Sequence, residues 1–69
     1  MEVNIVVMIN GEKTEVDGKN LMEYLTISGY DTKRVAVELN GAILPKSDYD
    51  KTVLLDGDKV EVVSFVGGG

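Results

Sequence analysis

The sequence of 69 residues contains neither cysteine nor histidine, and each absence excludes a class of chemistry. Without cysteine the chain has no disulfide, no thiolate metal site and no cysteine nucleophile. Without histidine it lacks the commonest general base and the commonest metal ligand in proteins. No metal or cofactor bound to the chain itself is therefore expected.

Basic residues and long apolar runs are also scarce. The chain has 7 basic against 12 acidic residues, a formal net charge of −5. This charge argues against nucleic acid and anionic membranes as partners and favours a partner with a basic surface. The first residues include no basic cluster of the kind that opens a signal peptide. The longest apolar run, Ile5–Ile9, is too short to span a bilayer, so we expect a cytoplasmic protein.

The residues that are present predict a β-hairpin at the start of a single small domain. Apolar residues recur at every second position from Val3 to Ile9, which is typical of a strand. Asn10-Gly11 follows, and this pair favours a type I′ turn because both central residues of that turn need a positive φ. The polar segment Lys13–Val16 is expected to return as an edge strand.

A helix is predicted over residues 21–28. Asn20 can cap its first turn, and Glu23 stands three residues later, at the spacing of a capping box. Apolar residues recur at helical spacing, and Gly29 can take the left-handed conformation that ends a helix. A helix of about two turns is not stable alone in water, so we expect it to pack against a sheet.

A second hairpin is predicted after the helix. Val35–Leu39 alternates as a strand, Asn40-Gly41 repeats the type I′ signal, and Ala42–Leu44 returns until Pro45 ends it. A loop with one helical turn is expected over residues 46–50.

The last strand is predicted over Lys59–Val66, after a tight turn at residues 56–58. Asp56 and Asp58 flank a glycine in that turn. Two carboxylates in this arrangement, without further oxygen ligands, form a turn far more often than a metal site.

This order of elements predicts an α+β fold of the β-grasp, or ubiquitin-like, class. We expect a mixed sheet of four to five strands with one helix packed on one face. The last strand should lie between the first and the third, parallel to the first. Residues 1–66 form the expected β-grasp domain, and residues 67–69 a flexible tail, because three glycines bury no side chain and lose much conformational freedom on ordering.

The alternation also assigns residues to the open face of the sheet, away from the helix. If Val7 and Ile9 face the helix, the residues between them face outward, and in the last strand Val62 faces inward. An exposed apolar patch of this kind often marks a partner site. The residues expected to bind partners are Val6, Met8, Val63, Phe65 and Val66, with Ala36 nearby.

Four features in this order resemble the ThiS/MoaD family of ubiquitin-like proteins, and within it the sulfur carriers of thiamine biosynthesis. They are the segments Val37–Gly41, Pro45, Leu55–Glu61 and Phe65–Gly69. In that family these segments form the strand, hairpin and proline, the turn before the last strand, and the reactive tail.

The resemblance implies a carrier that is acted on by enzymes rather than an enzyme. In such proteins an E1-like adenylyltransferase of the ThiF type uses ATP to adenylate the terminal carboxylate, here that of Gly69. Sulfur from a cysteine desulfurase converts it to a thiocarboxylate, and a thiazole synthase of the ThiG type takes that sulfur into the thiazole ring. Gly67 and Gly68 would be the arm that enters an active site too narrow for side chains.

Two alternatives stay open. One is another ubiquitin-like sulfur carrier, such as the small subunit of molybdopterin synthase, although the short chain and its Phe-Val-Gly-Gly-Gly ending favour the thiamine carriers. The other is a ubiquitin-like binding module with an inert tail. A residue added after Gly69 would inactivate a carrier, because its carboxylate moves, and would leave a binding module unaffected.

Overall fold

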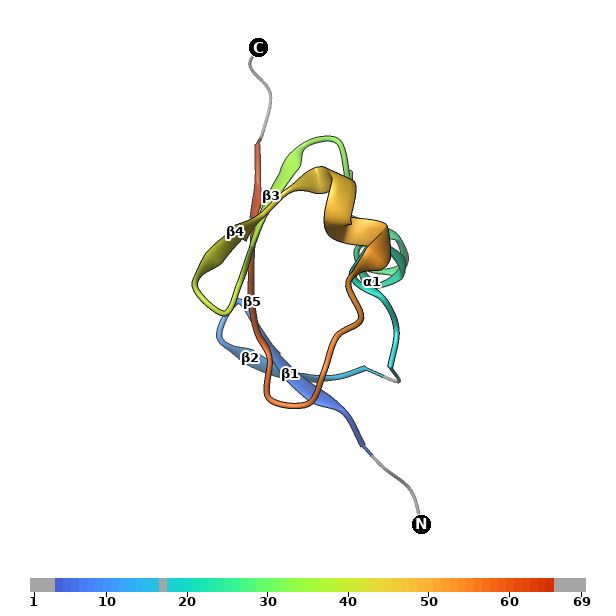
Figure 1. Ribbon diagram of the computed structural model, residues 1–69, viewed down its shortest axis with the longest axis vertical. Helices are drawn as coiled ribbons and strands as arrows, with labels where there is room; N and C mark the ends of the chain where they lie inside the picture. Colours follow the sequence, from blue (N-terminus) through green and yellow to red (C-terminus); the bar gives the residue numbers. More distant parts are fainter. Residues whose placement is uncertain (1–3, 17, 66–69) are drawn as a thin grey trace.

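Among the residues that the structure describes, a mixed sheet of five strands forms one layer and two short helices form the other (Figure 1). The computed structural model describes residues 4–16 and 18–65. The strands are β1 Val6–Ile9, β2 Glu12–Glu15, β3 Val35–Leu39, β4 Ala42–Leu44 and β5 Lys59–Ser64. The helices are α1 Leu21–Ile27 and the 3-10 helix η1 Lys46–Lys51.

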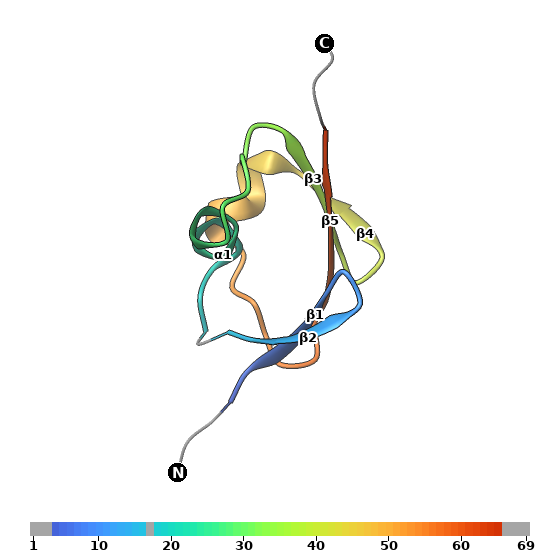
Figure 2. The ribbon, with the colours of Figure 1, turned by 180° about the vertical axis from the view of Figure 1, so that it is seen from behind.

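The strand order β2-β1-β5-β3-β4 confirms the predicted β-grasp topology. β5 lies at the centre, parallel to β1 and antiparallel to β3. The two hairpins β1–β2 and β3–β4 therefore form the outer parts of the sheet, as Figure 2 shows from behind. Every predicted strand is present, but β1 begins at Val6, and β2 runs over Glu12–Glu15 rather than 13–16.

Both hairpins turn on the predicted Asn-Gly pairs. Asn10 and Gly11 have φ values of 51° and 84°, and Asn40 and Gly41 have φ values of 53° and 86°. Asparagine and glycine adopt this left-handed region at the lowest cost, and the twist of a type I′ turn matches that of the strands. The two turns therefore set the strand pairing locally, from the sequence alone.

Helix α1 begins at the predicted cap and covers one face of the sheet. The Asn20 Oδ1 accepts a hydrogen bond of 2.8 Å from the Glu23 N–H, and Leu21 and Leu25 are fully buried. Ile27, at the last turn, is 70% exposed, so the buried stripe of the helix is narrower than the sequence pattern predicts. The helix ends one residue earlier than predicted, with Ser28 as its cap.

Tyr49 in η1 is a core residue that the sequence analysis did not predict. It is 1% exposed, and its hydroxyl lies 3.5 Å from the Val35 carbonyl oxygen. Leu54, in the segment after η1, is also fully buried. The core between the sheet and the helices thus closes with Tyr49 from a segment that looks like a polar loop and with Leu54 from the short apolar run of residues 53–55.

The turn before β5 is held by its two aspartates. The Asp56 Oδ1 accepts a hydrogen bond of 2.8 Å from the Val6 N–H, which fastens the turn to the start of β1. The Asp58 Oδ2 accepts one of 2.9 Å from the Leu55 N–H, and its Oδ1 accepts one of 3.1 Å from Asn40. The two carboxylates therefore stabilise the predicted turn by hydrogen bonds and fix the position at which β5 begins.

Candidate functional site

The central strand β5 leads directly towards the glycine tail. β5 ends at Ser64, two residues before the predicted end of the strand. The Phe65 N–H still donates a hydrogen bond of 2.7 Å to the Arg34 carbonyl oxygen. The chain is therefore held by the sheet up to Phe65. The predicted tail glycines Gly67, Gly68 and Gly69, and the predicted partner residue Val66, lie outside the described residues.

The faces of the two central strands are as predicted. Val7 in β1 and Val60 in β5 are fully buried, and Val62 is 7% exposed. On the other face Val63 is 57% exposed and Phe65 is 62% exposed. Alternation was a sufficient guide here because each strand buries one face against the helices.

The predicted open-face residues form two groups rather than the single patch that the sequence analysis expected. Met8 lies beside Lys59 in the parallel pair β1–β5. From there to Val63 is about 13 Å along the strand, at the usual rise per residue. Val6 lies still farther back, so neither Val6 nor Met8 belongs to the same apolar surface as Phe65. The physical reason is that β1 ends after Ile9, level with Val60, before β5 reaches its apolar end.

Four apolar side chains near the end of β5 form the group that we call the tail-side patch. It consists of Ala36, Ile43, Val63 and Phe65. Val63 pairs with Ala36 across β5 and β3, and Ile43 pairs with Glu38, which places it diagonally beside Ala36. Ile43 is 77% exposed and was not predicted as a site residue, although its position in the second hairpin gave the signal.

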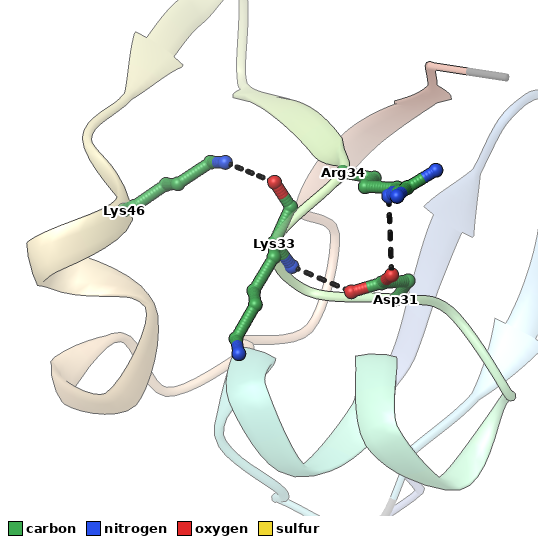
Figure 3. Close-up of polar contacts among 4 residues, drawn as sticks. All are labelled: Asp31, Lys33, Arg34 and Lys46. Atoms are coloured by element: carbon green, nitrogen blue, oxygen red, sulfur yellow. Dashed lines mark hydrogen bonds and ion pairs between the residues drawn. The ribbon is translucent and has the colours of Figure 1, made fainter. Parts of the chain in front are cut away.

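Arg34, Lys33 and Lys46 form polar contacts with Asp31 and the backbone at the start of β3 (Figure 3). The Arg34 guanidinium stands 3.7 Å from the Asp31 carboxylate and is 66% exposed. It shares a row of the sheet with Phe65, whose N–H binds its carbonyl oxygen. The Lys46 ammonium donates a hydrogen bond of 2.7 Å to the Lys33 carbonyl oxygen. Three basic residues and the acid Asp31 thus lie around the start of β3, on a chain whose net charge is −5.

Two glutamates form the opposite border of the patch. Glu38 and Glu61 are directly opposite each other in β3 and β5, one row from Val63. Both are exposed on the open face. The Lys59 ammonium lies 3.8 Å from the Glu61 Oε1. From the tail backwards, the face therefore carries Arg34 with its partner Asp31, then an apolar area, then the two glutamates.

A side chain takes the place of a strand where β1 ends. The Asn10 Oδ1 accepts a hydrogen bond of 2.7 Å from the Val62 N–H, and its Nδ2 donates one of 3.2 Å to the Val62 carbonyl oxygen. The primary amide thereby satisfies both polar groups of Val62 on the edge that β1 no longer covers. The sequence predicted Asn10 only as a turn residue, and the hydrogen bonds of its side chain to Val62 were not predicted.

Pockets, metal-binding clusters and membrane-spanning helices are all absent from the described residues. Residues 4–16 and 18–65 enclose no pocket. They also contain no group of three or more acidic, cysteine or histidine residues that could hold a metal ion. Within the same ranges, no helix is long and apolar enough to cross a membrane. What they present is an exposed sheet face beside the root of a glycine tail.

In the part of the chain that the structure describes, the sheet order, the single α-helix across one face and the central last strand define a β-grasp protein of the ubiquitin-like class. The model of the ThiS family matches residues 6–69. The chain belongs to the ThiS family.

Named relatives and a solved structure agree with this placement. The sulfur carrier protein ThiS of Thermus thermophilus is 41% identical over 64 residues, which cover 93% of this chain and 100% of that protein. A crystal structure of the thiamine biosynthesis protein ThiS from Geobacter metallireducens matches with a TM-score of 0.76 and 38% identity, over 94% of this chain and 100% of that one.

A thiazole synthase of Paramagnetospirillum magneticum contains a similar segment. It is 44% identical over 63 residues, which are 90% of this chain but only 19% of that enzyme. The chain therefore spans about a fifth of the length of this relative.

Proposed function

We propose that this chain is the sulfur carrier of thiazole formation in thiamine biosynthesis, and that it carries sulfur as a thiocarboxylate on Gly69. The observation that carries the proposal is the match of the ThiS family model, which extends from residue 6 through Gly69. A relative named as a sulfur carrier is matched over its whole length. On this proposal the chain catalyses nothing itself, and enzymes act on it.

The proposed chemistry needs only a carboxylate from this chain. A carboxylate oxygen of Gly69 attacks the α-phosphorus of ATP on an E1-like adenylating enzyme, and pyrophosphate leaves. A sulfide-level nucleophile then attacks the acyl carbon, and AMP leaves with the carboxylate oxygen. The product is a thiocarboxylate. The partner supplies the nucleotide site, in keeping with a chain that has no histidine or cysteine.

A thiazole synthase is the proposed acceptor of the sulfur. The support is the segment of similar sequence within an enzyme of that name. It favours the thiamine route over the molybdopterin route among the alternatives that the sequence leaves open. A ThiF-type enzyme as the adenylating partner and a cytoplasmic location are part of the same proposal. So is a cysteine desulfurase as the physiological source of sulfur, whose persulfide is reduced to the sulfide level by a thiol that becomes a disulfide.

The test is the intact mass of the protein after reaction. Incubation with an E1-like adenylating enzyme, ATP and sulfide should raise the mass by the difference between one sulfur and one oxygen atom. The matched control is the same chain with one alanine added after Gly69, which should fold normally and gain no sulfur. A tail that stays unmodified beside an adenylating enzyme with proven activity would contradict the proposal, as would equal activity of the extended chain.

A further inference from the structure

The open face of the sheet carries charges in a fixed order around the tail-side patch, and this order describes the surface that would fit it. Arg34 lies in the row of Phe65, and Glu38 and Glu61 lie in the row behind Val63. Strands of one sheet hold such rows at a set spacing. A partner that covers the patch must therefore meet both charged borders at once.

The glutamate pair is costly for this chain when it is alone. Like charges directly opposite each other in neighbouring strands destabilise a sheet. Lys59 lies 3.8 Å from Glu61 and balances part of that charge. In the ranges 4–16 and 18–65, Glu38 takes part in no ion pair. The sheet thus keeps an unfavourable pair of carboxylates at the edge of an exposed apolar surface, where a basic side chain of another protein could relieve the repulsion.

We propose that the tail-side patch binds a partner surface with an apolar centre and an arginine or lysine that sits between Glu38 and Glu61. This inference rests on the proposed function, because the partner is the thiazole synthase that receives the sulfur. At the other border, Arg34 lies beside Asp31 through its Nε, and the terminal nitrogens of its guanidinium face an acidic group of the same partner. Charges of opposite sign on the two sides of the patch admit one orientation of the partner, the one that directs the tail to its active site. Such complementarity acts on orientation and on the rate of association.

Charge reversal at one border is the sharpest test. Glu38→Lys replaces the repulsion with Glu61 by an attraction, so the melting temperature of the isolated chain should stay equal or rise. Its affinity for the purified thiazole synthase of the same organism should fall at least tenfold, measured by calorimetry at low salt. A residue with a purely structural role would move stability and affinity in the same direction.

Glu12→Lys is the matched control. Glu12 is exposed on β2, and the substitution changes the charge by the same amount. Because Glu12 pairs with the inward-facing Ile9, it does not lie on the open face with the tail-side patch. Its affinity should change less than twofold. Equal losses for the two variants would mean that only net charge matters and would overturn the proposal, and so would unchanged binding of Glu38→Lys.

The mass measurement on the wild-type chain separates this inference from the function on which it rests. If the wild type gains no sulfur, the proposed function fails. If it gains sulfur and Glu38→Lys binds the synthase as well as the wild type does, only the charge pattern fails. Sedimentation of the isolated chain tests whether a second copy of the chain, rather than the synthase, binds the patch. The expected result is a monomer, and a dimer that Glu38→Lys disrupts would show that a second copy covers the face.

Discussion

Phe65 and Val62 lie on one strand but on opposite faces of it, and they offer a direct comparison of binding with stability. Phe65 is 62% exposed, whereas Val62 is 7% exposed. Phe65→Ala should leave the melting temperature nearly unchanged and weaken binding to the adenylating enzyme or thiazole synthase at least tenfold, because exposed aromatics at interfaces are frequent hot spots. Thermal unfolding and calorimetric titration measure the two effects.

Val62→Ala should have the reverse effect. Removal of buried methyl groups should lower the free energy of unfolding by about 1–3 kcal/mol, with little direct effect on binding. Denaturant titration of the two variants side by side tests the assignment of the faces. If Phe65→Ala destabilises the monomer as much as Val62→Ala does, the patch is part of the core and the interface is misplaced.

Asn10 contributes to stability through its amide as well as through its backbone. The two hydrogen bonds to Val62 should each be worth about 1 kcal/mol. Asn10→Gly keeps the left-handed conformation easily accessible and removes only the side chain, so we expect a loss of about 1–2 kcal/mol in the free energy of unfolding. Urea denaturation measures this loss. Equal free energies of unfolding for the glycine variant and the wild type would show that Asn10 stabilises the fold through its turn conformation alone.

Helix α1 depends on its cap because its seven residues make a marginal helix. Asn20→Ala removes the acceptor for the Glu23 N–H and should cost about 1 kcal/mol of stability. Asn20→Asp keeps an acceptor oxygen and loses only the donor that binds the Asp50 carbonyl, a contact of 3.2 Å. The aspartate variant should therefore melt above the alanine variant. Equal melting temperatures would assign the effect to the Asp50 contact instead.

The elements of this fold were predictable because each has a local cause. The alternation of apolar residues predicted the strands and their faces. The Asn-Gly pairs predicted both hairpins, and Asn20 predicted the start of the helix. The buried Tyr49 was hidden because the residues around it are polar, and a short 3-10 turn can bury a single side chain. No period of two or 3.6 residues marks such a position.

The candidate site was predictable in composition but not in extent. Alternation says which face a residue occupies, yet nothing local states how far one parallel strand is shifted along another. The pairing of Met8 with Lys59 is set by a crossover that spans most of the chain. For that reason Val6 and Met8 were placed on the correct face but in the wrong neighbourhood. Ile43 was missed although its pairing with Glu38 in the second hairpin is local.

At the scale of the whole molecule, charge should keep the exposed patch from associating with itself. The chain has a net charge of −5 at pH 7 and a pI of about 4.4. Repulsion between copies disappears as the net charge approaches zero. Static light scattering should therefore report a monomer at pH 7 and association near pH 4.4. Phe65→Ser should reduce that association, and a variant that associates as strongly as the wild type would exclude the patch as the contact.

The parallel pairing of β1 with β5 decides how the domain responds to a pull on its C-terminal end. The two strands run in the same direction, so the start of β1 and the end of β5 lie at opposite ends of the sheet (Figure 1). If the C-terminal end of β5 is pulled while β1 is held, the two strands are sheared past each other, and their hydrogen bonds bear the force at the same time. A hairpin pulled from its open end would instead release its bonds one by one. A partner that pulls on the C-terminal end of β5 while it holds β1 would therefore load this pairing in shear.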